Sequence, residues 1–194
     1  GTNGIETRAN SLLVSLEKPY TNASGWGATL AYTYTDAKEN RQFGEHYALN
    51  YETLDGYGWS KAGGVSPHRL VLSGIYDAPW DITLSSKLVL ATQAPRYGTN
   101  CLPGWDRCIE QAQYTPVGTF GYKRFDIAAE KKFQVWNDMR IRVRADVLNL
   151  FDWVNYGGYD DWFGAPNEPN PTFGVPNSQL LPTRTLKLTV GLDW

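Results

Sequence analysis

Few residues of this chain have the types and spacing that chemistry at a site would need. Its 194 residues include two cysteines and two histidines, and His46 and His68 are remote in sequence from Cys101 and Cys108. A metal site needs more ligands than such a pair supplies. The Pro-Gly between the cysteines, in NCLPGWDRC, favours the turn that ring closure requires. The sequence therefore predicts a Cys101–Cys108 disulfide formed in an oxidising compartment, rather than two free thiols, and it predicts no metal or cofactor.

No group of residues indicates catalysis. The chain shows no Ser-His-Asp set, no close carboxylate pair beside an evident cleft and no phosphate-binding loop. Asp160 and Asp161 are adjacent, which could suggest calcium binding or acid–base chemistry, but we interpret them as an exposed acidic pair in a loop. The net charge is −2, so bulk charge points to no nucleic-acid partner. We therefore expect a protein that is not an enzyme and does not bind nucleic acid.

Aromatic residues between the regular segments are the best candidates for ligand binding. Residues 150–183 carry many aromatic rings and prolines, and all their charges are acidic. Such rings, with Asp and Asn beside them, could stack on sugars or hold a hydrophobic ligand, or they could pack the segment against its neighbours. The rings of Tyr47, Tyr51, Tyr57 and Trp59 have the same two interpretations. The substrate-binding candidates are Trp153, Tyr156, Tyr159, Asp160, Asp161, Trp162, Phe163, Tyr57 and Trp59.

Seven segments of alternating apolar and polar residues must position these candidates. A period of two predicts extended strands with one apolar and one polar face. The segments are residues 7–18, 26–35, 68–77, 81–93, 122–133, 139–147 and 184–194. Most have about ten residues, the length that a tilted strand needs to cross hydrocarbon. No segment has helical periodicity, and a mean hydropathy of −0.43 is compatible with strands of which only alternate residues face lipid.

The connections between these segments alternate in length. Residues 19–25, 78–80 and 134–138 are short turns, whereas residues 36–67, 94–121 and 150–183 are long. Structureless loops of about thirty residues are uncommon in compact soluble domains. Outer-membrane barrels combine tight periplasmic turns with long extracellular loops. On this interpretation every short turn and the C-terminus are periplasmic, and every long loop is extracellular.

Aromatic and charged residues are distributed as a barrel would require. Rings at the strand ends would form two belts, one per membrane interface. The periplasmic belt comprises Tyr20, Trp26, Tyr76, Trp80, Phe133, Trp136 and Trp194, and the extracellular belt comprises Tyr32, Tyr34, Tyr122, Phe151 and Trp153. Charges of both signs lie opposite the apolar face at Arg124, Asp126, Glu130, Lys132, Arg140, Arg142, Arg144, Asp146 and Lys187. In a wide barrel they would line water or a plug, and in a β-sandwich they would be ordinary exposed surface.

The segment NLFDWVNY, residues 149–156, resembles the end of the penultimate strand in TonB-dependent outer-membrane receptors. Asn149, Leu150, Phe151, Asp152 and Tyr156 match that pattern. The ending RTLKLTVGLDW is similar to the family's last strand, with Trp194 in place of the usual Phe as the barrel-assembly signal, and GWGATLAYTYTDA resembles its strand-and-loop entries. The resemblance implies an all-β, antiparallel transmembrane barrel, with residues 1–194 as the last seven of 22 strands. The plug domain and the earlier strands would lie outside this sequence.

The resemblance also implies active import of a scarce nutrient across the bacterial outer membrane. The substrate would be a siderophore, haem, cobalamin, a peptide or an oligosaccharide. The partners implied are outer-membrane lipid, the TonB complex through an N-terminal region, the barrel-assembly machinery and a small-molecule or oligosaccharide ligand. Two alternatives remain open. One is a small complete barrel, a passive porin or adhesin-like protein, with an eighth strand at residues 45–51; the other is a secreted β-sandwich that binds carbohydrate.

Overall fold

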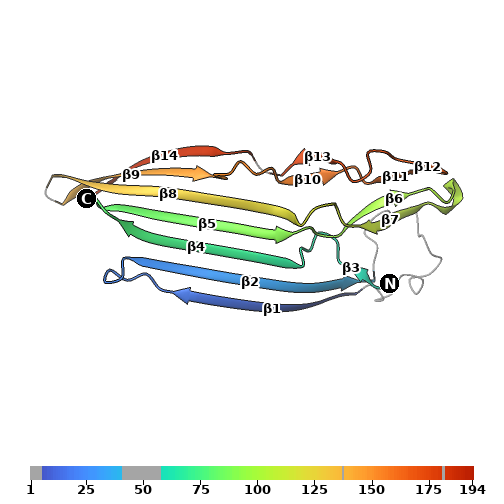
Figure 1. Cartoon of the computed structure of the whole chain (residues 1–194), viewed down its shortest axis with the longest axis horizontal. Helices are drawn as coiled ribbons and strands as arrows, with labels where there is room; N and C mark the ends of the chain where they lie inside the picture. The colour runs from blue at the N-terminus through green and yellow to red at the C-terminus, as the bar shows by residue number, and fades with distance from the viewer. Residues whose placement is uncertain (1–5, 41–57, 137, 181) are drawn as a thin grey trace.

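Seven long antiparallel strands form one sheet that runs most of the length of the molecule (Figure 1). The computed structural model describes residues 6–40, 58–136, 138–180 and 182–194. In sheet order the strands are β1 (Thr7–Lys18), β2 (Trp26–Glu39), β4 (His68–Ala78), β5 (Ile82–Thr92), β8 (Phe120–Trp136), β9 (Met139–Leu148) and β14 (Thr185–Asp193). All seven predicted strands are therefore confirmed, and so is the all-β, antiparallel fold class.

Two strands, β2 and β8, extend three or more residues beyond the predicted bounds. β2 continues to Glu39, where it pairs with the short strand β3 (Ser60–Lys61). β8 spans Phe120–Trp136, so much of the turn predicted at residues 134–138 is strand. The reason is pairing, because β9 begins at Met139 directly opposite Trp136. No helix among the described residues is long and apolar enough to cross a membrane.

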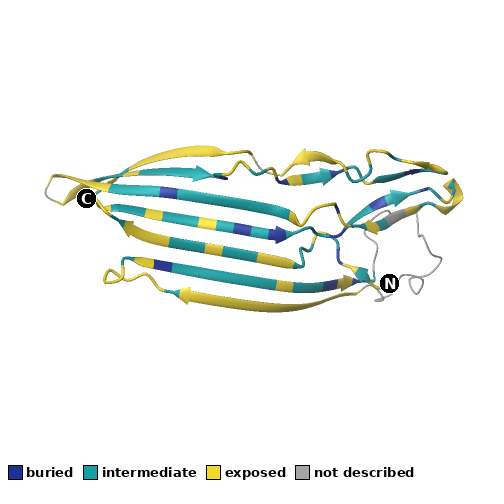
Figure 2. Cartoon of the chain, viewed as in Figure 1, coloured by how far each residue is buried: buried dark blue, intermediate teal, exposed yellow. Residues whose placement is uncertain are grey.

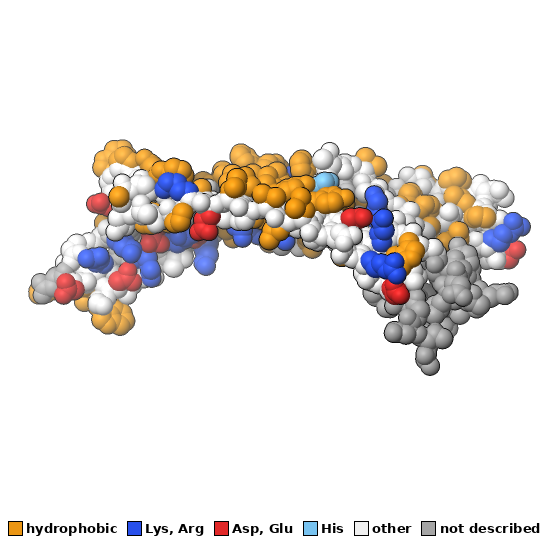
Figure 3. All heavy atoms as spheres, turned by 90° about the horizontal axis from the view of Figure 1, so that it is seen from below, with side chains coloured by type: hydrophobic (Ala, Val, Ile, Leu, Met, Phe, Trp, Pro, Cys, Tyr) orange, Lys and Arg blue, Asp and Glu red, His pale blue; other side chains and the backbone are white. Residues whose placement is uncertain are grey.

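The strand register places most of the apolar residues of the seven strands on one face. For example, Leu72 of β4 lies opposite Leu30 on one side and Leu88 on the other, and Leu88 lies opposite Phe125. The next residues along each strand, such as Thr29, Ser73 and Lys87, share the other face. Seen toward the edge of the sheet, hydrophobic side chains gather on the outward-arched surface and charged ones on the hollowed underside (Figure 3). We call these the convex and the concave face.

Neighbouring strands are staggered in one direction across the sheet. One row of directly opposed residues crosses all seven strands: Lys18, Ala28, Gly74, Ser86, Ile127, Val147 and Leu186. The row begins at the last residue of β1, but it ends at Leu186, near the start of β14, a strand that runs in the same direction as β1. The strands are therefore inclined to the line that joins their ends.

The sheet encloses little apolar core (Figure 2). In the described part of the chain no large side chain is fully buried, and the buried hydrophobic residues are Ala37, Ala62, Val89, Ala91, Cys101, Ala128 and Tyr159. Leucines of the convex face remain open even in the middle of the sheet, where Leu72 is 41% exposed. No other described strand packs on the convex face, and β1 and β14 have described partners on one side only. The predicted alternative of a β-sandwich is thus not observed.

The two ends of the sheet differ. Short turns and the C-terminus lie at one end, and the long connections lie at the other (Figure 1). These connections contain further strands: β6 (Arg96–Asn100), β7 (Ile109–Tyr114), β10 (Tyr156–Tyr159), β11 (Trp162–Ala165), β12 (Glu168–Pro169) and β13 (Pro176–Gln179), with a 3-10 turn at Trp105–Arg107. They form a four-stranded sheet in the order β12-β11-β6-β7 and a β10–β13 pair. The proposed eighth strand at residues 45–51 lies outside the described residues.

Candidate functional site

A polar cavity lies on the concave face, where the sheet meets the long connections. It has two adjoining parts that share Gly64, Ser66 and Tyr122. The part toward the loops has a volume of about 650 Å³, and we call it the tyrosine chamber after Tyr97, Tyr114, Tyr122, Tyr156 and Tyr159. The part over the strands, about 690 Å³, is the cationic chamber, and its charged lining residues are Arg69, Lys87, Arg124 and Asp126.

The tyrosine chamber depends on a close contact between two loops. β6 and β11 run parallel, and the amide of Thr99 donates a hydrogen bond to the carbonyl oxygen of Asp161 (2.9 Å). A Cβ at Gly98 would lie 2.1 Å from that oxygen, so only glycine allows this approach. Arg96 and Tyr97 of β6 line the same chamber as Tyr159 and Asp161. The Arg96 guanidinium lies 4.6 Å from the centre of the Tyr159 ring.

Two tyrosines of this chamber, Tyr97 and Tyr114, have raised pKa values and keep their protons at neutral pH. Burial, together with the hydrogen bond that Tyr97 donates to Glu39, raises the pKa of Tyr97. Burial and the nearby Asp161 carboxylate raise the pKa of Tyr114, although Arg96 opposes this. The hydroxyl of Tyr159 accepts a hydrogen bond from the Gln93 amide at 3.3 Å. The chamber therefore offers neutral rings and hydroxyl groups, with one cation and one anion among them.

The cationic chamber takes its charges from three adjacent strands. Strand alternation puts Arg69 of β4, Lys87 of β5 and Arg124 of β8 on the concave face. Asp126 is the one acidic residue among the described residues of the lining, and its Oδ1 accepts bonds from the Arg124 Nε (2.7 Å) and from the Asn149 amide (2.8 Å). Among described residues no ion pair joins Arg69 or Lys87 to a carboxylate. Both side chains are exposed in the cavity.

Charged residues nearer the short-turn end of the concave face form ion pairs with one another. Arg144 lies 2.9 Å from Asp146 and 3.7 Å from Glu130, which is its opposite residue on β8. Arg142 lies 3.5 Å from Asp193. The predicted position of these charges opposite the apolar face is confirmed. Opposite charges on neighbouring strands attract each other across the sheet. We therefore interpret the arginines of β9 as structural residues of the sheet, not as ligand contacts.

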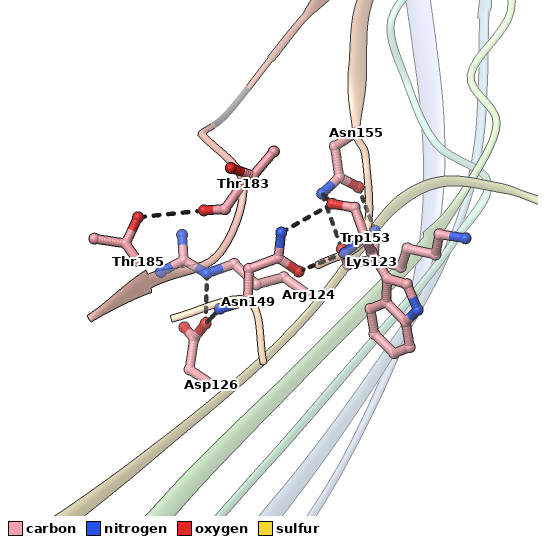
Figure 4. A network of polar contacts seen from close by, with 8 residues as sticks. All are labelled: Lys123, Arg124, Asp126, Asn149, Trp153, Asn155, Thr183 and Thr185. Carbon is pink, nitrogen blue, oxygen red and sulfur yellow. Dashed lines mark hydrogen bonds and ion pairs between the residues drawn. The ribbon is translucent and has the colours of Figure 1, made fainter. Parts of the chain in front are cut away.

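The segment of residues 149–156 braces the end of β9 against β8 (Figure 4). Asn149 is buried and has a left-handed φ of 54°. Its side chain donates to the Trp153 carbonyl (2.9 Å) and accepts from the Trp153 amide (3.0 Å). Asn155, also buried, accepts from the Lys123 amide (2.7 Å) and donates to the Lys123 carbonyl (2.9 Å), as a paired strand would. Asn155 thus extends the ladder of β8 beyond the last residue of β9, and Asn149 closes the turn that leads to it.

Asp160 organises the loop that follows. Its Oδ1 accepts a bond from the Trp162 amide (3.1 Å), and its Oδ2 accepts bonds from the Asn170 side chain (3.1 Å) and the Thr172 hydroxyl (2.7 Å). These bonds lower the pKa of the Asp160 carboxyl below its ordinary value, with the Thr172 bond the largest cause. Asp160 is thus occupied by its own loop. The neighbouring Asp161 side chain is exposed and lines the tyrosine chamber.

Other aromatic residues form a core within the long connections. The rings of Phe163 and Phe173 lie 4.0 Å apart between centres, and Tyr114 of β7 lies 4.9 Å from Phe173. At the tip, Trp105 stacks near Trp162 with 6.2 Å between centres. The predicted Cys101–Cys108 disulfide closes this tip and is confirmed. Packing of the segment against its neighbours, one of the two interpretations of these rings, is therefore correct for Phe163 and Trp162.

The sequence-predicted site residues fall into separate groups. Tyr156, Tyr159 and Asp161 line the tyrosine chamber. Trp153 lies instead beside Phe151, which stacks on Phe125 of the convex face at 5.4 Å. Trp59 receives the Arg8 guanidinium 4.3 Å from its ring centre, and Trp194 is 90% exposed beyond β14. Tyr57 lies outside the described residues.

Several residues of the cavity were not among the sequence-based candidates: Arg69, Lys87, Arg96, Tyr97, Tyr114 and Tyr122. Tyr122 was assigned to the extracellular belt, but it lies opposite Ala91, whose side chain is on the concave face. The alternation of β4 and β5 could have placed Arg69 and Lys87 on that face. Nothing local in the sequence could have brought Tyr97 and Tyr114 to the same chamber as Tyr159.

Within the described ranges, no group of three or more His, Cys, Asp or Glu side chains could hold a metal ion. The arrangement is one of hydrogen-bonding and charged groups around an open cavity, which suits reversible binding. Comparisons of the chain with protein-family models, curated proteins and solved structures found no match.

Proposed function

We propose that this chain is part of the wall of an outer-membrane transporter of the TonB-dependent receptor kind, which imports a scarce nutrient. The observation that carries the proposal is the division of one sheet into an apolar convex face and a polar concave face across seven consecutive strands. Large exposed apolar surfaces mark contact with a membrane or a partner. A lipid-facing wall explains why the sheet has so little core of its own.

The stagger of the strands supports a barrel. Leu186 stands seven residues before Asp193, the end of β14, whereas Lys18, six strands away in the same row, is the end of β1. With about 3.3 Å per residue and about 4.8 Å between strands, this stagger corresponds to a tilt of about 40°, within the range of transmembrane barrels. The open edges at β1 and β14 then pair with further strands of the same barrel, because exposed edges invite aggregation.

The orientation follows from the two ends of the sheet. The short turns and the C-terminus face the periplasm, and the ordered loops with their cavity face the outside. A ligand captured in the cavity then passes inward through the lumen lined by the concave face. In such a transporter the energy for import is supplied by TonB.

The test measures both where the protein is located in the cell and whether nutrient uptake depends on energy. Cells with and without the full gene are given radiolabelled ferric siderophores, haem, cobalamin or oligosaccharides, before and after a protonophore collapses the inner-membrane gradient. We expect a heat-modifiable band in the outer-membrane fraction, and uptake of one compound that requires both the gene and the gradient. Gene-dependent uptake that persists without the gradient would indicate a passive porin instead. A protein found in the soluble fraction would contradict the proposal altogether.

A further inference from the structure

We propose that the cavity binds an anionic ligand that carries flat rings, with its negative groups at Arg69 and Lys87 and its rings among the tyrosines. This inference rests on the proposed transport function, since it names the class of substrate that the same cavity would take. Nothing in the sequence singled out these two cations.

The cationic chamber has a local excess of positive charge. Arg69, Lys87 and Arg124 line the cationic chamber, and the acidic residue beside them, Asp126, already accepts bonds from Arg124 and from the Asn149 amide. Nearer the short-turn end of the same face, by contrast, Arg142 and Arg144 each lie within 3.7 Å of a carboxylate. A cleft lined by charge of one sign concentrates ligands of the opposite sign. The cation excess is therefore located where a ligand would enter.

The spacing of Arg69 and Lys87 suits a single ligand. Arg69 lies directly opposite Ala91, which is four residues along β5 from Lys87. This separation is about 13 Å along the strand, and both side chains are long enough to shorten it by several ångströms. One ligand with two or more negative groups could contact both cations. The chamber volume of about 690 Å³ is within the usual range for small-molecule sites.

The adjoining tyrosine chamber has no such excess of charge. Its charges balance, because Arg96 and Asp161 both lie near Tyr114. Selection there depends on ring faces and on neutral hydroxyl groups, which stack on flat rings and donate hydrogen bonds. Tyr122 belongs to both chambers, so the ring portion of a ligand can lie beside its charged portion without a break. Together the chambers fit a ligand with rings at one end and negative groups at the other.

The test is equilibrium binding of pyranine, a pyrene ring with three sulfonates, to the purified full-length protein in detergent. Fluorescence anisotropy reports the bound fraction. We expect binding that weakens with added salt, and a loss of about tenfold in affinity for either Arg69→Gln or Lys87→Gln. Arg140→Gln is the matched control. This arginine is also on the concave side, but its Nε bonds to Gln134 (3.1 Å) and it lines neither chamber. Its loss should leave the affinity unchanged, and heat-modifiable mobility shows that each variant has folded.

Competition identifies the scaffold that carries the charge. Displacement of pyranine by salicylate supports the proposal, and equal displacement by trigalacturonate, whose charged rings are puckered, would overturn the requirement for flat rings. Equal displacement by neutral maltotriose would overturn the charge requirement. The proposal also fails if pyranine does not bind the wild-type protein, as when acidic groups elsewhere in the barrel already cover the cations, or if the Arg69 and Lys87 variants bind it normally. Because this assay needs no energy source, its failure is distinguishable from a failure of gradient-dependent uptake.

Discussion

At the scale of single residues, two adjacent aspartates have opposite roles. Asp160 accepts three hydrogen bonds from its own loop, whereas the Asp161 carboxylate is exposed in the tyrosine chamber. Local side-chain bonds of the first kind are typical of Asp in turns. Asp160 therefore stabilises the walls of the cavity, and Asp161 is available to a ligand.

This contrast predicts different effects of the same substitution. Asp160→Ala leaves the Trp162 amide without the carboxylate that accepts its bond, and it removes one of two acceptors from the Asn170 side chain and from the Thr172 hydroxyl, so the loop should open more often. Hydrogen exchange of residues 156–179, followed by mass spectrometry at neutral pH, should become faster in this variant. Asp161→Ala is the control and should exchange as the wild type does. Equal exchange in both variants would show that the Asp160 bonds do not hold the loop.

The same bonds give the loop a pH dependence of definite sign. Because the pKa of Asp160 is lowered in the folded loop, its stabilising effect is complete above the ordinary carboxyl pKa, about 4. The effect is lost as the pH falls through the lowered pKa. Pepsin should therefore cut the wild-type loop readily only in strong acid, while Asp160→Asn should show less change in cutting over that range. Loss of protection between pH 6 and pH 5 would contradict this assignment.

The residue types alone predict the disulfide correctly, but they predict only part of the cavity lining. Cys101 and Cys108 are close in sequence, so local turn chemistry suffices to pair them. The aromatic residues of 150–183 gave two interpretations because a ring that packs and a ring that binds have the same sequence signature. Their separation depends on partners such as Tyr114 and Trp105, which come from another loop.

At the scale of elements, the segment of residues 149–156 shows why a short motif can be structural. Asn149 adopts a left-handed conformation that asparagine tolerates, and its side chain closes a turn around Trp153. Asn155 then pairs with the backbone of β8. The motif ends β9 and directs the chain into the loop that carries Tyr156 and Tyr159. Its function is to position the cavity wall.

Substitution of Asn149 should separate backbone and side-chain effects. Asn149→Gly keeps the conformation but loses both bonds to Trp153, and Asn149→Ala also pays for a left-handed alanine. We expect losses of about 1–3 kcal/mol for glycine and roughly 1 kcal/mol more for alanine. The measurement is the urea midpoint for loss of heat-modifiable mobility in the full-length protein. An alanine variant as stable as the wild type would show that the turn is not needed.

The long strands were predictable because each carries its own periodic signal, and the elements within the loops were not. β1 has the predicted bounds, Thr7–Lys18, since alternation alone fixes which residues face the same way. The parallel contact of β6 with β11 joins residues some sixty positions apart and depends on Gly98. No local pattern specifies such a contact, so a connection interpreted as an irregular loop is here a small sheet.

At the scale of the whole molecule, the arrangement of the faces determines what surrounds the protein. The strands bury few large side chains against one another, and β14 presents Leu188 and Val190 at 69% and 72% exposure. A soluble domain of this size would cover such residues with a second layer. Lipid on the convex face and water or a plug on the concave face account for the same sheet without one. Composition and periodicity predict the two faces, and the described strands form an open sheet.

Two adjacent residues of β2 provide a direct test of which face meets lipid. Leu30 lies on the convex face between Leu16 and Leu72, and Thr29 lies on the concave face between Glu17 and Ser73. Leu30→Arg should destabilise the assembled barrel by about 2–4 kcal/mol, the cost of a lipid-facing arginine near the bilayer centre. Thr29→Arg faces water beside an acidic residue and should cost far less. The urea midpoint of the heat-modifiable form in membranes measures both. Equal losses, or a greater loss for Thr29→Arg, would mean that the convex face does not contact the membrane.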